Sequence, residues 1–316
     1  MDSRIRIGIS SCLLGNRVRY DGQHKLDAFL VETLGRYVDY VPVCPEVECG
    51  LGIPRPAMRL VGTAERHRLV TIHTGVDHTD RMHAWAERRV KELADENLCG
   101  FIFKSKSPSS GMERVKVYND KGAVVAGVSG LFAAGFMRAF PLLPVEDEGR
   151  LHDPDLRENF IERVFALDRY RRGPGVTRTA RALTAFQASH KLLIMSHSPQ
   201  AVAALGRLAA SADRGAMARV LAEYEALLLK TLALRATPAK HANVLQHMQG
   251  YFKTLLDADE KSEIADLIAQ YRSGLVPLIV PVTLFRHFSR KYRVAYLQGQ
   301  VYLEPHPLEL KLRNHA

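Results

Sequence analysis

The stretch IRIGISSCLLGNRVRYDG, residues 5–22, joins a β-branched run to a loop that is rich in serine, glycine and cysteine. The isoleucines of IRIGIS (5–10) alternate along the chain, which predicts a buried strand. Similar runs recur at YVPV (40–43), GFIFK (100–104) and VKVY (115–118), and helical patterns separate them. Strands that alternate with helices predict a parallel, Rossmann-like α/β sheet in the N-terminal domain.

The second half of the chain has a different pattern. An amphipathic segment at 156–172 leads into GPG (173–175), after which strand-like runs largely vanish and apolar residues recur at helical spacing. We therefore expect an α/β domain over 1–145, a linker helix and break over 146–178, and an all-α helical domain over 179–316.

Composition places the chain among soluble globular proteins. It has 316 residues, of which 47% are hydrophobic and 25% are charged. No apolar run approaches the roughly 20 residues of a membrane span, and the N-terminus lacks the pattern of a secretory signal. We expect a cytoplasmic protein, in which the four cysteines are unlikely to form structural disulfides.

The positive charge is unevenly distributed. The formal net charge is +10, and residues 151–316 hold 23 Lys and Arg against 15 Asp and Glu, whereas residues 1–150 hold 21 against 19. A basic domain attracts polyanions, so RNA or DNA is a candidate partner. Ordinary solvated surface is the alternative.

Three loops should converge in space, because ligands of parallel sheets gather beyond the carboxyl ends of the strands. They are SSCLLGNRVRYDG (10–22), CPEVECGLGIPRP (44–56) and KSKSPSSG (104–111). The first two carry Cys12, Cys44 and Cys49, while Cys99 opens a predicted strand and is interpreted as a buried thiol. Three thiolates can hold a soft metal and leave one coordination position open, but their spacing does not separate zinc from an iron–sulfur cluster.

The order of motifs resembles a known family. SSCLLG, VRYDG, CPEV, GLG and KSPSSGMERVKVY are similar to the 2-thiouracil desulfurases, which are α/β proteins with a [4Fe–4S] cluster. HKLLIMSHSP, NVLQHMQGYFK and VYLEPHPLELKLRN resemble the helical YbgA-like domain that is often fused behind them. Fusions of this type include desulfidases that convert 4-thiouridine in tRNA to uridine. The resemblance therefore implies that the basic helical half holds tRNA.

The resemblance also implies a set of ligands. Cys12 and Cys44 match two cysteines that hold the cluster, but Ser110 stands where many members of the family have the third. Cys49 occupies a position at which those members usually have another residue. We expect that the third ligand has moved to the second loop, so that Cys12, Cys44 and Cys49 bind three irons.

Two polar groups match the active site of the family. Glu46 is the expected general acid or base, and Ser107 is expected to bind the uracil or relay a proton. From the residues alone, an ion pair between Glu46 and Arg55 or Arg59 is the favoured interpretation of the glutamate.

Further polar side chains surround the proposed site in the sequence. Arg17, Arg19, Asp21, Arg55 and Ser109 are expected to bind substrate. Solvated surface is the alternative for the arginines, and a turn is the alternative for the aspartate.

The densest basic and aromatic cluster lies near the C-terminus. Arg286, Arg290, Lys291 and Arg293 are expected to bind RNA phosphates. They are interleaved with Phe288 and Tyr292, and a ring there could stack on a base. The histidines of the helical half contain no H-E-x-x-H pair, and we expect them to make local hydrogen bonds.

Three functions remain open at this stage. The first is a tRNA 4-thiouridine desulfidase, which must reach an outward-flipped base. The second is a desulfurase of free thiouracil-type bases. The third is a nucleic-acid-binding protein whose cysteines hold structural zinc.

Overall fold

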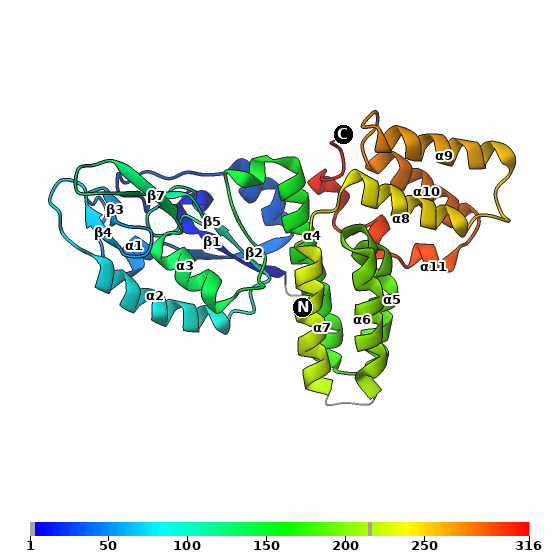
Figure 1. The fold of residues 1–316 in the computed structure, drawn as a ribbon, viewed down its shortest axis with the longest axis horizontal. Helices are drawn as coiled ribbons and strands as arrows, with labels where there is room; N and C mark the ends of the chain where they lie inside the picture. Colours follow the sequence, from blue (N-terminus) through cyan, green and yellow to red (C-terminus); the bar gives the residue numbers. More distant parts are fainter. Residues whose placement is uncertain (1–3, 214–216, 316) are drawn as a thin grey trace. The chain divides into compact units, whose positions relative to one another are not determined.

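The computed structural model describes residues 4–213 and 217–315 (Figure 1). The chain divides into two compact units, Met1–Leu156 (unit 1) and Arg157–Ala316 (unit 2), and the division falls within the segment 146–178 that was expected to connect two domains. Within the described residues every β-strand belongs to unit 1, while unit 2 is helical. The predicted fold class, a parallel α/β domain followed by an all-α domain, is confirmed.

Unit 1 contains the predicted parallel sheet. Its strands lie in the order β2-β1-β5-β8, and every neighbouring pair is parallel. The strands are β1 (Ile5–Ser10), β2 (Val38–Val43), β5 (Gly100–Phe103) and β8 (Val145–Asp147). Gly8 in β1 has a packing role, because a Cβ atom at this position would lie 2.2 Å from a ring carbon of Phe101.

A second sheet differs from the sequence prediction. VKVY was expected in the parallel sheet, but it forms β6 of a mixed sheet with the order β4-β3-β6-β7. Both hairpins are antiparallel, because the connections within them are too short for a crossover, and only β3 and β6 run parallel. The strands are β3 (Met58–Gly62), β4 (His67–Thr71), β6 (Val115–Tyr118) and β7 (Val124–Val128).

The helices of unit 1 cover an aromatic core. Helix α2 (Thr79–Ala94) directs Met82, Trp85 and Leu93 inward, which agrees with the predicted helical spacing. Helix α3 (Leu131–Ala139) brings Phe132 and Phe136 against Phe101 of β5, with ring centroids 5.8 and 4.6 Å apart. A single turn, α1 (Pro45–Glu48), follows β2. Short 3-10 or π turns complete the unit at Ser11–Leu14, Phe29–Thr33, Leu34–Arg36 and Arg150–His152.

Helix α4 (Pro154–Tyr170) crosses the division between the units, and its residues from Arg157 onward belong to unit 2. The predicted break at GPG is a π-helical turn over Arg171–Gly175 that continues α4. The remaining α-helices are α5 (Ala180–His197), α6 (Pro199–Ala210), α7 (Met217–Leu232), α8 (Pro238–Gly250), α9 (Ala258–Arg272), α10 (Ile279–Lys291) and α11 (Ala295–Gln298). Short 3-10 turns lie at Ser211–Asp213, Val301–Leu303 and Leu308–Leu310.

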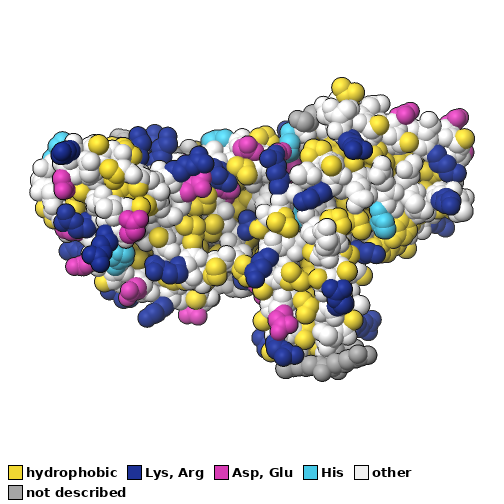
Figure 2. Space-filling view, viewed as in Figure 1, with side chains coloured by type: hydrophobic (Ala, Val, Ile, Leu, Met, Phe, Trp, Pro, Cys, Tyr) yellow, Lys and Arg dark blue, Asp and Glu magenta, His cyan; other side chains and the backbone are white. Residues whose placement is uncertain are grey.

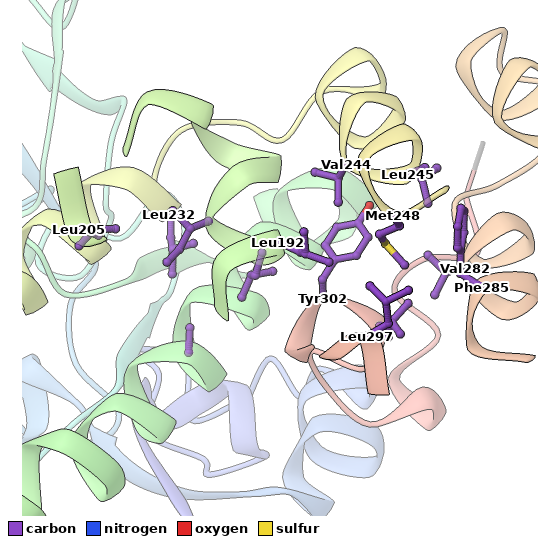
Figure 3. Close-up of a cluster of buried hydrophobic side chains, with 14 of the residues drawn as sticks. Leu192, Leu205, Leu232, Val244, Leu245, Met248, Val282, Phe285, Leu297 and Tyr302 are labelled. Atoms are coloured by element: carbon purple, nitrogen blue, oxygen red, sulfur yellow. The ribbon is translucent and has the colours of Figure 1, made fainter. Parts of the chain in front are cut away.

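One apolar core holds unit 2 together. Figure 3 shows members of this core from α5, α6, α7, α8, α10 and α11, together with Tyr302 of the C-terminal segment. Tyr302 is fully buried, so the C-terminal segment is an integral part of the packing. No helix in the described residues combines the length and the apolar character needed to cross a membrane.

Candidate functional site

A cavity of about 420 Å³ lies in unit 1 where three strands of the parallel sheet end. Its walls come from the loops that follow β1, β2 and β5, which are neighbours in the sheet. The predicted convergence of these loops is therefore confirmed. The lining side chains that bear on chemistry are Cys12, Arg19, Cys44, Glu46, Arg55, Lys104, Ser105, Ser107 and Ser110.

Two thiols face this cavity. Cys12 lies in the 3-10 turn that follows β1, and Cys44 precedes the single turn α1. Burial raises the pKa of Cys12 to about 11 and that of Cys44 to about 12. Both side chains therefore carry their protons at neutral pH, and a metal that binds them must displace those protons.

Cys49 lies outside the cavity lining. It ends the α1 turn, its Sγ lies 3.3 Å from the carbonyl oxygen of Glu46, and its side chain packs against the apolar core of unit 1. Cys44 is the extended residue before the α1 turn and Cys49 is the residue after it, and only the side chain of Cys44 lines the cavity. Among the described residues no three His, Cys, Asp or Glu side chains are grouped to hold a metal. The predicted three-cysteine set is therefore not assembled in this structure.

Ser110, and not Cys49, lines the cavity beside the two thiols. Its side chain is buried, lines the cavity with Cys12 and Cys44, and is fixed by the bond from its N–H to Ser107 Oγ (3.1 Å). The donor set thus fits a soft metal cluster with two sulfurs, while the third donor that faces the cavity is a hydroxyl oxygen.

Glu46 is held by side chains of its own loop (44–56) and of the loop 104–111. Its Oε1 accepts hydrogen bonds from Ser107 Oγ (3.3 Å) and, over a shorter distance, from Ser109 Oγ. Its Oε2 lies 3.7 Å from Arg55 Nη2 and 3.7 Å from Cys44 Sγ. The ion pair with Arg55 and the position in the cavity, which were alternatives in the sequence, therefore occur together.

The first turn of α3 fixes the loop 104–111, which carries Ser107 and Ser109. The carbonyl oxygen of Ser109 accepts the N–H groups of Phe132 (3.0 Å) and Ala133 (3.1 Å). Gly130 allows this close approach, since a Cβ atom there would lie 2.6 Å from the backbone of Ser109. Ser109 is fully buried, so it supports Glu46 from behind and does not line the cavity.

The predicted substrate residues separate into two groups. Arg55 and Arg19 line the cavity, and Arg55 Nη1 also donates to the carbonyl oxygen of Val18 (3.0 Å). Arg17 and Asp21 are exposed and lie outside the lining. Asp21 accepts the N–H of Gln23 (3.1 Å) and pairs with Arg19 (3.3 Å), which is the turn-forming role considered as its alternative.

Sequence reasoning missed a cationic group in the cavity wall. Lys104 follows β5, and its Nζ donates to Ser105 Oγ (3.1 Å) and to the carboxylate of Glu148. Glu148 follows β8, the strand beside β5, and despite burial its pKa is lowered by its bonds to Lys104 and Ser105. The signal was a lysine directly after a buried strand, but its acidic partner is 44 residues away in the chain.

The predicted RNA cluster in unit 2 is partly occupied by internal contacts. Phe288 belongs to the core, Arg286 pairs with Glu304, and Lys291 pairs with Glu260 (2.7 Å). Arg290 and Arg293 are exposed and form no ion pair with any residue that the structure describes. Figure 2 shows Lys and Arg side chains spread over the visible face of the molecule.

Comparison with known proteins gives two family matches. The family described as 2-thiouracil desulfurase matches residues 7–148, and the family described as protein of unknown function DUF1722 matches residues 191–307.

Two curated relatives carry the description of uncharacterized proteins. Protein YbgA of Escherichia coli (strain K12) is 33% identical over 158 residues, which cover 50% of this chain and 94% of YbgA. Protein YbbK of Bacillus subtilis (strain 168) is 32% identical over 135 residues, which cover 40% of this chain and 85% of YbbK. A solved structure, that of the [4Fe-4S]-dependent thiouracil desulfidase TudS, is 30% identical with a TM-score of 0.39, and the match covers 48% of this chain and 95% of TudS.

Proposed function

The chain belongs to the 2-thiouracil desulfurase family, with a DUF1722 domain behind the family domain, and from this premise we propose that it removes sulfur from a thiolated uracil, with 4-thiouridine in tRNA as its substrate. The overall change replaces C=S by C=O. Water supplies the oxygen atom, and the sulfur leaves as hydrogen sulfide, so the reaction needs no oxidant or reductant.

The observation that carries the proposal is the position of Glu46. Its carboxylate faces the same cavity as two thiols, held by hydroxyl groups on one side and by Arg55 on the other. A carboxylate so placed can accept a proton from the attacking water and return it to the ring nitrogen, a contribution of typically 10²–10⁴-fold in rate. Ser107 donates to Glu46 and lines the cavity, so it can relay that proton.

The cavity offers two cysteine side chains as ligands for a metal centre. Cys12 and Cys44 would hold a [4Fe–4S] cluster, which when bound supplies a soft Lewis acid for the thiocarbonyl sulfur. Arg55 and Lys104 also line the wall, each paired with a carboxylate, that of Glu46 and that of Glu148. Their N–H groups can donate hydrogen bonds to an oxygen of the base.

The proposed RNA substrate is supported by the charge of the second half. Residues 151–316 hold eight more basic than acidic side chains (23 against 15), and Arg290 and Arg293 are available to phosphates. Phosphate contacts of this kind are sensitive to salt. A tRNA substrate should therefore lose affinity as the salt concentration rises, whereas a free base should not.

The proposal is tested by turnover of oxygen-protected protein on thiolated tRNA and on free 4-thiouracil. Loss of the thiocarbonyl absorbance should be faster with tRNA, and salt should suppress it. Glu46→Gln should lower the rate by about 10²–10⁴-fold. Glu65→Gln, an exposed site in the β3–β4 hairpin, removes the same charge and should have no effect.

Each alternative function has its own outcome in this experiment. Equal, salt-independent turnover of both substrates would favour the free-base desulfurase. Protein with bound zinc and no turnover of either substrate would favour the nucleic-acid-binding protein with a structural metal site.

A further inference from the structure

Unit 2 contains a second cavity that the proposed function does not use. Its volume is about 370 Å³, and it lies between helix α4 and the C-terminal segment 304–309. Phe165 and Arg169 of the helix face Pro305, His306 and Leu308 of the segment. The segment belongs to the motif VYLEPHPLELKLRN, which carries the resemblance to the YbgA-like domain.

Arg169 is a half-buried cation, and no carboxylate oxygen of the described residues lies within 4 Å of its guanidinium. Its Nε donates to His190 Nε2 (3.1 Å), and its Nη1 donates to the carbonyl oxygen of Pro305 (2.8 Å). Its Nη2 is buried and bonds to no residue that the structure describes. Burial lowers the pKa of Arg169 to about 10, so the guanidinium stays charged at neutral pH. Glu162 and Asp168 attract this charge only from beyond ion-pair distance. The buried, unbonded Nη2 atom of a cation therefore indicates an anionic ligand.

His306 offers the complementary group in the same cavity. Only 8% of its surface is exposed, and its Nδ1 lies 3.3 Å from the carbonyl oxygen of Pro307. A carbonyl can only accept, so Nδ1 carries the hydrogen and Nε2 presents a lone pair. Within the described chain this buried Nε2 atom has no hydrogen-bond partner. The Nε2 atom can therefore accept a hydrogen bond from a hydroxyl or N–H group of a ligand.

The two requirements together select a ligand class. The ligand must bring an anionic oxygen to Arg169 and a hydrogen-bond donor to His306. Each nucleotide of RNA has a phosphate and, on the adjoining ribose, a 2′-hydroxyl that can donate, whereas DNA lacks the second group. Phe165 adds a half-buried aromatic ring against which a base can pack.

Two carboxylates on the cavity wall do not cancel this charge. Glu304 and Glu309 are both exposed, whereas Arg169 is half-buried. Solvent and salt therefore screen the charges of the two carboxylates more effectively than they screen the charge of Arg169. Glu304 is also neutralised by its ion pair with Arg286.

We propose that this cavity binds one nucleotide of an RNA chain, with the phosphate on Arg169 and the ribose 2′-hydroxyl on His306. The inference rests on the proposed RNA substrate and gives the helical domain a specific role, which is to select RNA over DNA. The chemistry itself stays in unit 1.

The test measures binding of labelled oligouridylate to the full chain by fluorescence anisotropy, beside the 2′-deoxy and 2′-O-methyl oligomers of the same length. The native protein should bind the ribo-oligomer about fivefold more tightly than the other two, because only the ribo-oligomer donates to His306. Arg169→Gln should weaken binding of all three by about tenfold. Arg207→Gln, an exposed arginine of α6, is the matched loss of charge and should leave affinity within twofold.

His306→Phe should remove the preference for ribose and leave the affinity for the deoxy-oligomer unchanged. Equal affinity of the native protein for the three oligomers would overturn the inference, and this comparison does not depend on how well a variant folds. An Arg169→Gln protein that behaves like Arg207→Gln would overturn it as well. The inference would also be overturned if inorganic phosphate raised the melting temperature of the protein while none of the oligomers did so.

The outcome is separable from that of the proposed function. Free 4-thiouracil reports on unit 1 alone, so Arg169→Gln should turn it over at the native rate. If the native protein desulfurates thiolated tRNA and yet ignores the 2′-hydroxyl, the nucleotide site fails and the desulfidase stands. If oligomer binding behaves as expected but no thiolated substrate is converted, the desulfidase fails and the site stands.

Discussion

Unit 2 should lose stability steeply below neutral pH, because it buries uncharged histidines. His190, His241 and His306 are 3%, 6% and 8% exposed. Burial, together with nearby arginines, lowers their pKa values from 6.5 to about 3, about 3 and about 4. His190 Nε2 accepts the Nε–H of Arg169, which requires a neutral ring, and His241 Nδ1 bonds to the Tyr302 hydroxyl.

The sign follows from proton binding. In the unfolded chain these rings take up protons below about pH 6.5, whereas in the native protein they stay uncharged. Unfolding therefore binds protons, and the free energy of unfolding decreases as the pH is lowered. At about pH 5 each histidine costs about 2 kcal/mol relative to pH 8, or about 6 kcal/mol for the three. This is comparable with the whole stability of a typical domain.

Two spectroscopic signals distinguish the units within the full chain. Trp85 is the only tryptophan and is buried in unit 1, while most helical residues, and so most of the circular dichroism at 222 nm, belong to unit 2. Urea unfolding should be followed by both signals at several pH values. Between about pH 8 and pH 5 the dichroism midpoint should fall by roughly 2–3 M urea, while the Trp85 midpoint should move far less.

Single substitutions sharpen the test. His241→Gln should reduce the proton uptake of unfolding near pH 5 by about one, whatever it does to stability at pH 8. His247→Gln, at an exposed site on the same helix, is the matched control substitution. A dichroism midpoint that is the same at pH 8 and pH 5 would refute the reasoning, because it would mean that the buried rings titrate as they do in water.

Two further predictions concern unit 1. Oxygen-protected Cys12→Ala and Cys44→Ala proteins should lose most of their iron, whereas Cys49→Ala should keep its iron and Ser110→Cys should bind more. The reason is that, of the side chains at 12, 44, 49 and 110, all but the one at 49 line the cavity. Iron and acid-labile sulfide analysis measures the difference, and loss of iron in Cys49→Ala would restore the three-cysteine set expected from the sequence. Gly8→Ala should destabilise unit 1 by about 1–3 kcal/mol, because the added methyl group would meet an aromatic ring at 2.2 Å; an unchanged urea midpoint of the tryptophan signal would count against this packing.

The outline of the site could be predicted from sequence because it depends on local patterns. Alternating isoleucines mark β1, and the loops that follow β1, β2 and β5 meet because neighbouring parallel strands end at one edge. Cys12 and Cys44 therefore reach one cavity whatever the details of packing. The change to helical periodicity after 156–172 likewise locates a second, helical unit.

Side-chain direction could not be predicted in the same way. Cys49 and Ser110 both stand in the predicted loops, but one turn of helix directs Cys49 away from the cavity, and a hydrogen bond to Ser107 fixes Ser110 in its wall. Phe288 looked like an RNA-stacking ring, yet it is in the core because α10 presents that face to the other helices.

The sequence by itself determined the buried strands β1, β2 and β5, the change to helices in the second half, the loops that carry the thiols, and the excess of positive charge in the second half, because periodicity and composition are properties of neighbouring residues. Only the tertiary structure decided which side chains share a cavity. Lys104 meets Glu148, and Arg169 and His306 line one pocket, although 44 and 137 positions respectively separate them in the chain. Contacts of this kind depend on how elements pack, and no local pattern records them.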